Sequence, residues 1–190
     1  DLSTIDYSAF DRWEIGRVLF YPRPEWTSLP MNMSVNYETV SIPVEEDVCI
    51  GGRFYENTPD SPNILFFHGN GEIVADYDDI AQIFVRNGIN FLAVDYRGYG
   101  QSTGSPTVTN MMRDSHLIFE YTKQWLSDHN CSGVFIVMGR SLGSASALEI
   151  ASNYRQRIDG LIVESGFALV GPLLQLMGLS LQFLGLSEEE

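Results

Sequence analysis

Short apolar runs alternate with longer, helically spaced segments from residue 63 onward. Each run is rich in aliphatic, β-branched or aromatic side chains, a pattern typical of strands buried on both faces of a sheet. The predicted strands are 63–67, 89–94, 134–138 and 160–163, and the predicted helices are about 73–87, 106–129 and 144–151. This alternation predicts an α/β protein with a mostly parallel sheet and helices on both faces.

The longest helical segment, 106–129, carries its apolar residues at i, i+3, i+4 spacing, which predicts one buried face. The residues on that face are Val108, Met111, Met112, Ser115, Ile118, Phe119, Trp125 and Leu126.

The chain before residue 63 has a different pattern. Residues 37–44 and 48–55 read as two strands joined by the acidic turn 45–47, which is too short for a crossover and therefore predicts an antiparallel edge. Residues 1–34 have no clean period, and we expect a short helix near 8–19 followed by an irregular arm. We therefore predict that 1–34 packs on a single domain at 35–190.

Residues 167–186 form an uncharged stretch of 20 residues. Glycine, proline and glutamine interrupt it, which argues against a membrane span. We expect a buried or lid-forming helical segment.

Composition narrows the classes of partner. The 190 residues are 44% hydrophobic and carry a formal charge of −14, with Lys123 as the only lysine. This balance disfavours nucleic acid and anionic membranes as partners. Cys49 and Cys131 are isolated, which predicts free thiols in a reducing compartment, and no signal peptide is visible at the start, so we expect a cytoplasmic location.

The sequence Gly139-Arg140-Ser141-Leu142-Gly143 lies between a predicted buried strand and a predicted helix. A serine at the tip of a strained strand-to-helix turn needs glycine two residues before and two after, because its neighbours are crowded. The turn would present the hydroxyl at the positive end of the helix. The alternative is a glycine-rich turn with an idle serine, so a second signal is needed.

That second signal is an ordered set of four motifs at predicted strand ends: HGNGE at 68–72, DYRGYGQS at 95–102, GRSLGS at 139–144 and VESGF at 163–167. Together they resemble the α/β-hydrolase superfamily of serine hydrolases, in particular the branch related to serine aminopeptidases and acyl-protein thioesterases. The resemblance covers roughly residues 39–168.

The resemblance implies roles for particular residues. Ser141 would be the nucleophile, and the backbone N–H of Leu142 would form one half of the oxyanion hole. The other half would be the N–H of Asn70 or, as the alternative, of Gly71. We expect glycine at 69 and 71 because side chains there would block approach to the substrate oxygen.

Four other polar residues near these motifs have open assignments. For His68, shaping the loop is favoured over acting as a base, and Asp95 and Arg97 are expected to brace loops. Arg140 could contact substrate or have a surface or packing role.

The chain departs from the family pattern after Ser141. The family order is serine, then acid, then histidine, but no histidine follows His129, and His116 and His129 precede the nucleophile. Glu164 stands where some members carry the acid, although a bracing role is favoured. We therefore expect an α/β-hydrolase fold lacking its last strands, and we expect the 190-residue chain alone to be inactive.

The predicted function of the full-length protein is hydrolysis of acyl esters or thioesters through an acyl-enzyme. A peptidase of the same fold and a non-catalytic binding protein are the alternatives. We expect no metal or organic cofactor, a small-molecule or acyl substrate, and no nucleic acid; the oligomeric state stays open.

Overall fold

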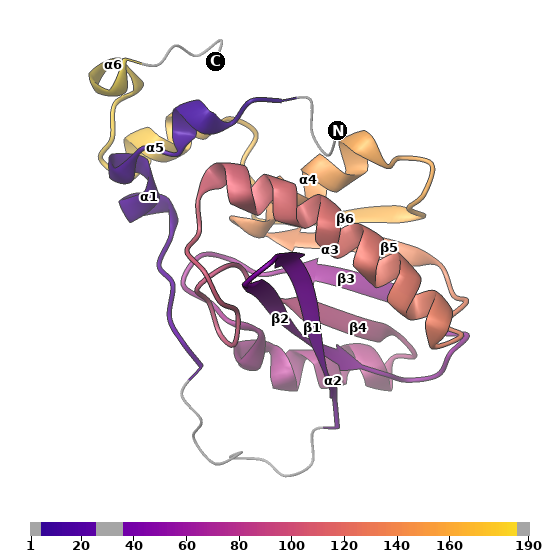
Figure 1. The fold of residues 1–190 in the computed structure, drawn as a ribbon. Coiled ribbons are helices and arrows are strands. Elements are labelled where there is room, and N and C mark those ends of the chain that lie inside the picture. The colour runs from indigo at the N-terminus through magenta and orange to yellow at the C-terminus, as the bar shows by residue number, and fades with distance from the viewer. Residues whose placement is uncertain (1–4, 26–35, 186–190) are drawn as a thin grey trace.

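The computed structural model describes residues 5–25 and 36–185. Six strands and six α-helices follow one another with two short 3₁₀ turns in this part of the chain (Figure 1). The strands are β1 (Glu38–Glu45), β2 (Val48–Tyr55), β3 (Asn63–Phe67), β4 (Asn90–Val94), β5 (Phe135–Arg140) and β6 (Gly160–Glu164). The helical elements are η1 (Ser8–Phe10), α1 (Trp13–Leu19), η2 (Val74–Tyr77), α2 (Asp78–Arg86), α3 (Val108–Asp128), α4 (Gly143–Asn153), α5 (Val170–Leu176) and α6 (Leu181–Leu184).

The strands form one sheet in the order β1-β2-β4-β3-β5-β6. β1 pairs with β2, and β2 with β4, in antiparallel register, whereas the pairs formed by β3, β4, β5 and β6 are parallel. The predicted parallel sheet with an antiparallel N-terminal edge is confirmed. Because parallel strands share one carboxyl edge, the loops after β3, β4 and β5 meet there.

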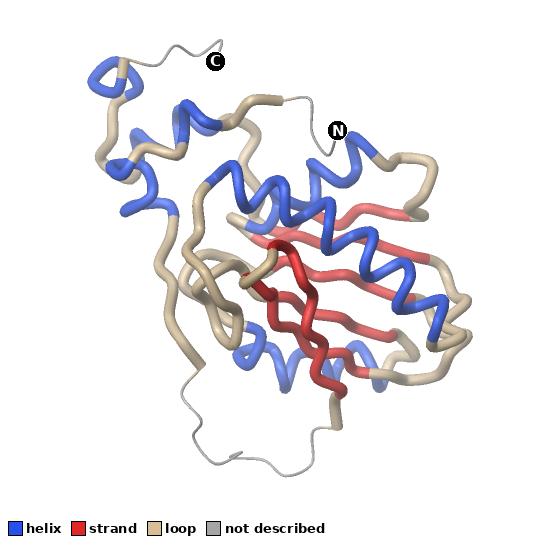
Figure 2. Tube along the Cα trace, viewed as in Figure 1, coloured by secondary structure: helices blue, strands red, loops and turns tan. Residues whose placement is uncertain are grey.

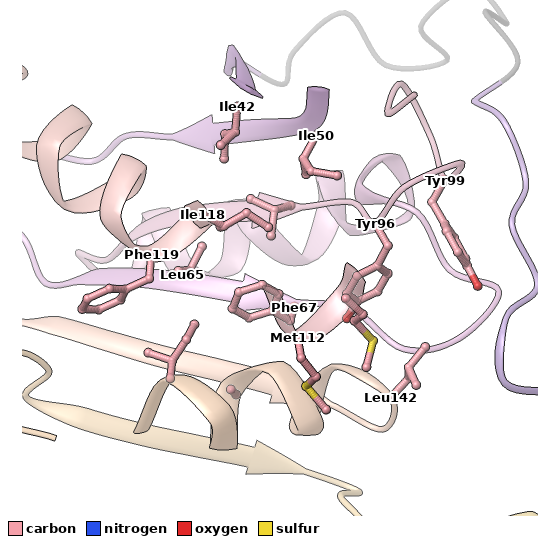
Figure 3. Packing of buried hydrophobic residues seen from close by; sticks show 14 of the residues in the cluster. Ile42, Ile50, Leu65, Phe67, Tyr96, Tyr99, Met112, Ile118, Phe119 and Leu142 are labelled. Atoms are coloured by element: carbon pink, nitrogen blue, oxygen red, sulfur yellow. The ribbon is translucent and has the colours of Figure 1, made fainter. Parts of the chain in front are cut away.

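Alternation along the central strands sends side chains to two separate layers. Leu65 and Phe67 pack in one cluster with residues of α3 and α4, while Ile64 and Phe66 pack in another with Ala81 of α2. Figure 2 shows the helices on both sides of the sheet. The main core therefore lies between the sheet and the α3–α4 layer, and Figure 3 shows part of it.

Two predicted helices are interrupted. The segment predicted as a helix at 73–87 begins with the 3₁₀ turn η2, and Ile73 itself is extended because Asp76 accepts its N–H at 3.0 Å. The segment predicted at 8–19 breaks at Arg12, whose ψ of 143° is extended. Asp11 instead accepts the N–H of Thr109 at 2.9 Å and so joins this break to the start of α3.

The N-terminal segment packs against the rest of the chain. Ile15, Leu19 and Phe20 are buried in the main core, and Pro24 forms a parallel bridge with Gly100. The predicted boundary between 34 and 35 lies outside the described residues and stays a prediction.

Residues 167–186 contain α5 and α6, which lie near α1 at the upper left of Figure 1. Leu174 and Leu184 are buried in the main core, whereas Leu169 and Leu176 are exposed. Among the described residues, no helix is both long enough and apolar enough to cross a membrane.

Candidate active site

Ser141 occupies the turn between β5 and α4 with a φ of 48°. Residues other than glycine rarely adopt this left-handed backbone conformation. The predicted strained strand-to-helix turn is therefore present. The N–H of Ser141 donates to the carbonyl of Glu164 at 2.9 Å, which holds the turn against the end of β6.

The flanking glycines are required by close backbone packing. A Cβ at Gly139 would lie 2.3 Å from the carbonyl oxygen of Gly143, and a Cβ at Gly143 would lie 2.1 Å from that of Phe67. Both distances are far below van der Waals contact. The spacing in the motif thus lets α4 begin directly against the ends of β3 and β5.

Leu142 combines a buried side chain with a free backbone donor. Its side chain lies in the main core with Phe67 and Tyr99, as Figure 3 shows. Its N–H makes no hydrogen bond to any described residue. An N–H on the residue directly after the serine, without a bond to any described residue, is what one half of an oxyanion hole requires.

The loop after β3 holds His68 in its interior. The His68 ring is fully buried; its Nδ1 lies 2.8 Å from the Gly69 carbonyl oxygen, so Nδ1 carries a proton. Its Nε2 lies 3.2 Å from Asp95 Oδ1, but this contact is out of line for a hydrogen bond. The contacts match the loop-shaping role favoured from the sequence.

Asn70 and Gly71, the two candidates for the second donor, differ in their surroundings. The Asn70 side chain accepts hydrogen bonds at 2.8 Å from the N–H of Tyr21 and from the hydroxyl of Tyr99, while its own N–H bonds to no described residue. The N–H of Gly71 faces the Tyr99 oxygen. Burial raises the pKa of Tyr99 to about 12, and the N–H groups of Tyr21 and Gly71 oppose that rise. The free N–H favours Asn70 as the donor.

The structure gives Gly69 and Gly71 reasons of their own, while the expected role in substrate approach stays a prediction. A Cβ at Gly69 would lie 2.8 Å from the carboxylate of Glu72, so glycine there leaves room for that side chain. Gly71 has a φ of 74°, which explains the glycine by backbone conformation.

Arg140 lies between two carboxylates. Its Nε donates to Glu72 Oε1 at 3.2 Å, and its Nη1 pairs with Oε1 of Glu164. These residues also line a cleft of about 480 Å³ whose apolar wall includes Phe66 and Met138. Glu164 is therefore bonded to Arg140.

Asp95 and Arg97 brace the loop after β4, as expected. Asp95 is buried and accepts the N–H of Val74 at 3.0 Å. Arg97 donates to both oxygens of Asp114 in α3 at 2.7 and 2.8 Å, and to Glu45 at 2.8 Å.

The other two histidines lie elsewhere. His116 is buried with Nε2 at 3.0 Å from Glu149, and His129 stacks on Trp125. None of the three histidines contacts Ser141 in the described part of the chain.

Sequence reasoning missed two sources of support for the loop at 68–72. Glu72 ends the HGNGE motif, whose expected roles concern the preceding residues, and Tyr21 and Arg23 lie in a segment without a clean period. Arg23 Nε donates to the Gly71 carbonyl at 2.9 Å, so the N-terminal arm reaches the candidate site. The acidic residue that ends the HGNGE motif is the sequence signal from which Glu72 could have been found.

The chain is similar to curated proteins over more than half of its length. It is 30% identical over 151 residues to Protein bem46 of Schizosaccharomyces pombe, covering 76% of this chain and 49% of that protein. It is 31% identical over 111 residues to lysophosphatidylserine lipase ABHD12 of Xenopus tropicalis, covering 56% of this chain and 28% of that protein. The chain spans about half the length, or less, of these curated relatives.

The chain is also similar in fold to solved structures. The Pyrococcus furiosus esterase Pf2001 matches with a TM-score of 0.58 and 26% identity, covering 75% of this chain and 55% of that one. The family described as "Serine aminopeptidase, S33" matches residues 59–187, more than half of the chain. By this match, and by the sheet and turn described above, the chain belongs to that family of α/β-hydrolases.

Proposed function

We propose that the full-length protein is a serine hydrolase that cleaves acyl esters or thioesters through an acyl-enzyme on Ser141. The observations that carry the proposal are the left-handed φ of Ser141 and the N–H groups of Leu142 and Asn70, neither of which bonds to another described residue. The hydrolase family and the esterase and lipase relatives support the same class of reaction.

In the proposed reaction, Ser141 Oγ attacks the acyl carbonyl carbon and gives its proton to a general base. The carbonyl oxygen becomes an oxyanion that accepts hydrogen bonds from Leu142 and Asn70. Collapse breaks the bond to the leaving alcohol or thiol, which takes the proton, and water then releases the acid and restores the serine. The base must come within about 3 Å of Ser141, and a histidine in the remainder of the full-length protein is its proposed source.

The substrate proposal rests on the segment at 167–186. Its exposed leucines, Leu169 and Leu176, follow the strand end that carries Glu164, and we propose that the segment borders a pocket for an apolar acyl group. The hydrolase would then prefer apolar acyl chains to charged ones. A non-catalytic binding protein and a peptidase are the alternatives.

The test is covalent labelling of the full-length protein with a fluorophosphonate, followed by turnover of esters of increasing chain length. We expect labelling and turnover that Ser141→Ala abolishes. Ser146→Ala is the matched control, since Ser146 lies in α4, the helix that follows Ser141, is buried, and its hydroxyl bonds to no described residue. Absence of labelling would support the binding protein, amide cleavage without ester cleavage would support the peptidase, and equal rates on charged and apolar acyl groups would refute the pocket.

A further inference from the structure

Glu72 makes several of the hydrogen bonds that hold the loop at 68–72, which carries the Asn70 donor. Its Oε2 accepts the N–H of Gly69 at 2.7 Å and the hydroxyl of Tyr77 at 2.6 Å. Its own N–H donates to the Gly69 carbonyl at 3.3 Å. Gly69 is therefore held by Glu72 at both its N–H and its carbonyl.

This hold determines where the Asn70 N–H points. The Gly69–Asn70 peptide is planar and trans, so the Asn70 N–H is antiparallel to the Gly69 carbonyl. The carbonyl is fastened inward by His68 Nδ1 and by the N–H of Glu72. The Asn70 N–H is thereby directed the opposite way, where it makes no described hydrogen bond.

The carboxylate of Glu72 is charged under ordinary conditions. Burial by itself raises the pKa of Glu72, but the hydrogen bonds from Tyr77 and the Gly69 N–H, together with the Arg140 guanidinium, outweigh burial and lower it. A charged carboxylate accepts several hydrogen bonds at once and makes stronger ones than a neutral acid does.

Arg140 joins Glu72 to the turn at Ser141. It is the residue directly before Ser141, and its Nε contacts the Glu72 oxygen that the loop does not use. The Glu164 carboxylate holds the other side of the guanidinium, and the backbone carbonyl of Glu164 accepts the Ser141 N–H. The two halves of the site, one after β3 and one after β5, are thus connected through one arginine.

We propose that Glu72 and Arg140 are positioning residues that set the Asn70 donor relative to Ser141. The inference rests on the proposed function, because it concerns the oxyanion hole of that reaction. It assigns Arg140 to a structural link within the site rather than to substrate contact, since carboxylates already occupy both sides of its guanidinium.

The test compares Arg140→Met, Glu72→Gln and the double variant in the full-length protein. We expect kcat/KM for an acyl ester to fall about 10-fold in each single variant, less than the 10²- to 10³-fold that follows outright removal of an oxyanion donor. The loss should lie in kcat, with KM within twofold. Because both changes break one link, the double variant should lose little more than the worse single variant.

A transition-state analogue separates positioning from general damage. A trifluoromethyl ketone forms a hemiketal with the serine and places an oxyanion in the hole, so its inhibition constant should rise by the same factor as kcat/KM falls. Arg140→Lys keeps a positive charge near Glu72 and should restore part of kcat/KM and part of the affinity for the ketone. The matched control is Arg157→Met, which breaks an ion pair with Glu120 of similar exposure outside the site and should leave kcat/KM unchanged.

The outcomes separate the two proposals. Wild-type labelling by a fluorophosphonate together with Arg140→Met and Glu72→Gln activities within twofold of wild type would overturn the positioning role alone. A loss confined to KM would overturn it as well, in favour of substrate contact. No labelling of the wild-type protein would overturn the proposed function and this inference together.

Discussion

Ser141 is a residue whose backbone conformation costs stability. A left-handed φ costs an L-residue about 1–2 kcal/mol, and such strain persists only where the surroundings impose it. Here the Glu164 carbonyl accepts the N–H of Ser141. Ser144 donates two hydrogen bonds to the carbonyl of Ser141, at 3.0 Å from its N and 2.6 Å from its Oγ. The serine is held in the turn from both sides.

This strain predicts an unequal effect of two substitutions. Ser141→Gly should give a protein more stable than Ser141→Ala by about 1 kcal/mol, because glycine adopts a positive φ without steric cost and only part of that gain is lost to its greater chain entropy. Urea unfolding of the two variants measures the difference. Both variants lack the hydroxyl, so hydroxyl contacts cancel in the comparison, and an alanine variant as stable as the glycine variant would mean that the turn is not strained.

At the scale of elements, the loops at the carboxyl edge are held by charged side chains from neighbouring elements. Arg97, after β4, bonds through two nitrogens to Asp114 in α3, and both side chains are almost fully buried. A third bond runs to Glu45 at the end of β1, whose side chain is half exposed. One guanidinium therefore ties the β4 loop to α3 and to the antiparallel edge.

Removal of its two partners should have very different effects. Asp114→Ala leaves a buried guanidinium without its main partner and should lower the free energy of unfolding by about 3–5 kcal/mol. Glu45→Ala removes an exposed partner and should lower it by less than about 1 kcal/mol. Chemical denaturation of the two variants side by side checks this, and equal losses would show that burial does not control the energetics here.

Across the whole molecule, buried tyrosines set a limit to stability in alkali. Burial, reinforced by a nearby carboxylate, raises the pKa of Tyr55 beside Asp78 and of Tyr77 beside Glu72, and burial raises that of Tyr96. In the unfolded chain tyrosine titrates near about pH 10. Above that pH the unfolded state loses protons that the folded state retains, so the stability gained from these groups is present below about pH 10 and is lost as pH rises further.

We therefore expect the urea midpoint to be steady from about pH 8 to pH 9.5 and to fall steeply above about pH 10. Absorbance at 295 nm should report tyrosine ionisation together with unfolding. Tyr55→Phe removes one of the buried hydroxyls and should make the fall shallower. A midpoint independent of pH up to about 11.5 would contradict the prediction.

The sequence by itself determined the layers of the fold and the strained turn at Ser141. Short apolar runs separated by helical periods define buried strands and amphipathic helices because side-chain direction follows from local geometry. The Gly-x-Ser-x-Gly turn is equally local. Gly139 and Gly143 leave no room for a Cβ because they contact backbone of the same strand–turn–helix unit and of the neighbouring strand β3. The breaks in the predicted helices at Arg12 and Ile73 were not predicted. An extended backbone at Arg12 and one hydrogen bond from the Ile73 N–H to Asp76 decide them.

Only the tertiary structure decided how the candidate site is held together. The Tyr21 N–H meets Asn70 across 49 residues of chain, and Arg140 meets Glu72 across 68. No period or motif encodes such pairs, because each depends on which loops the sheet order brings to one edge and on the directions that long side chains take there. The preference for Asn70 over Gly71 in the proposed site likewise depends on a tertiary contact, that of the Gly71 N–H with the Tyr99 oxygen.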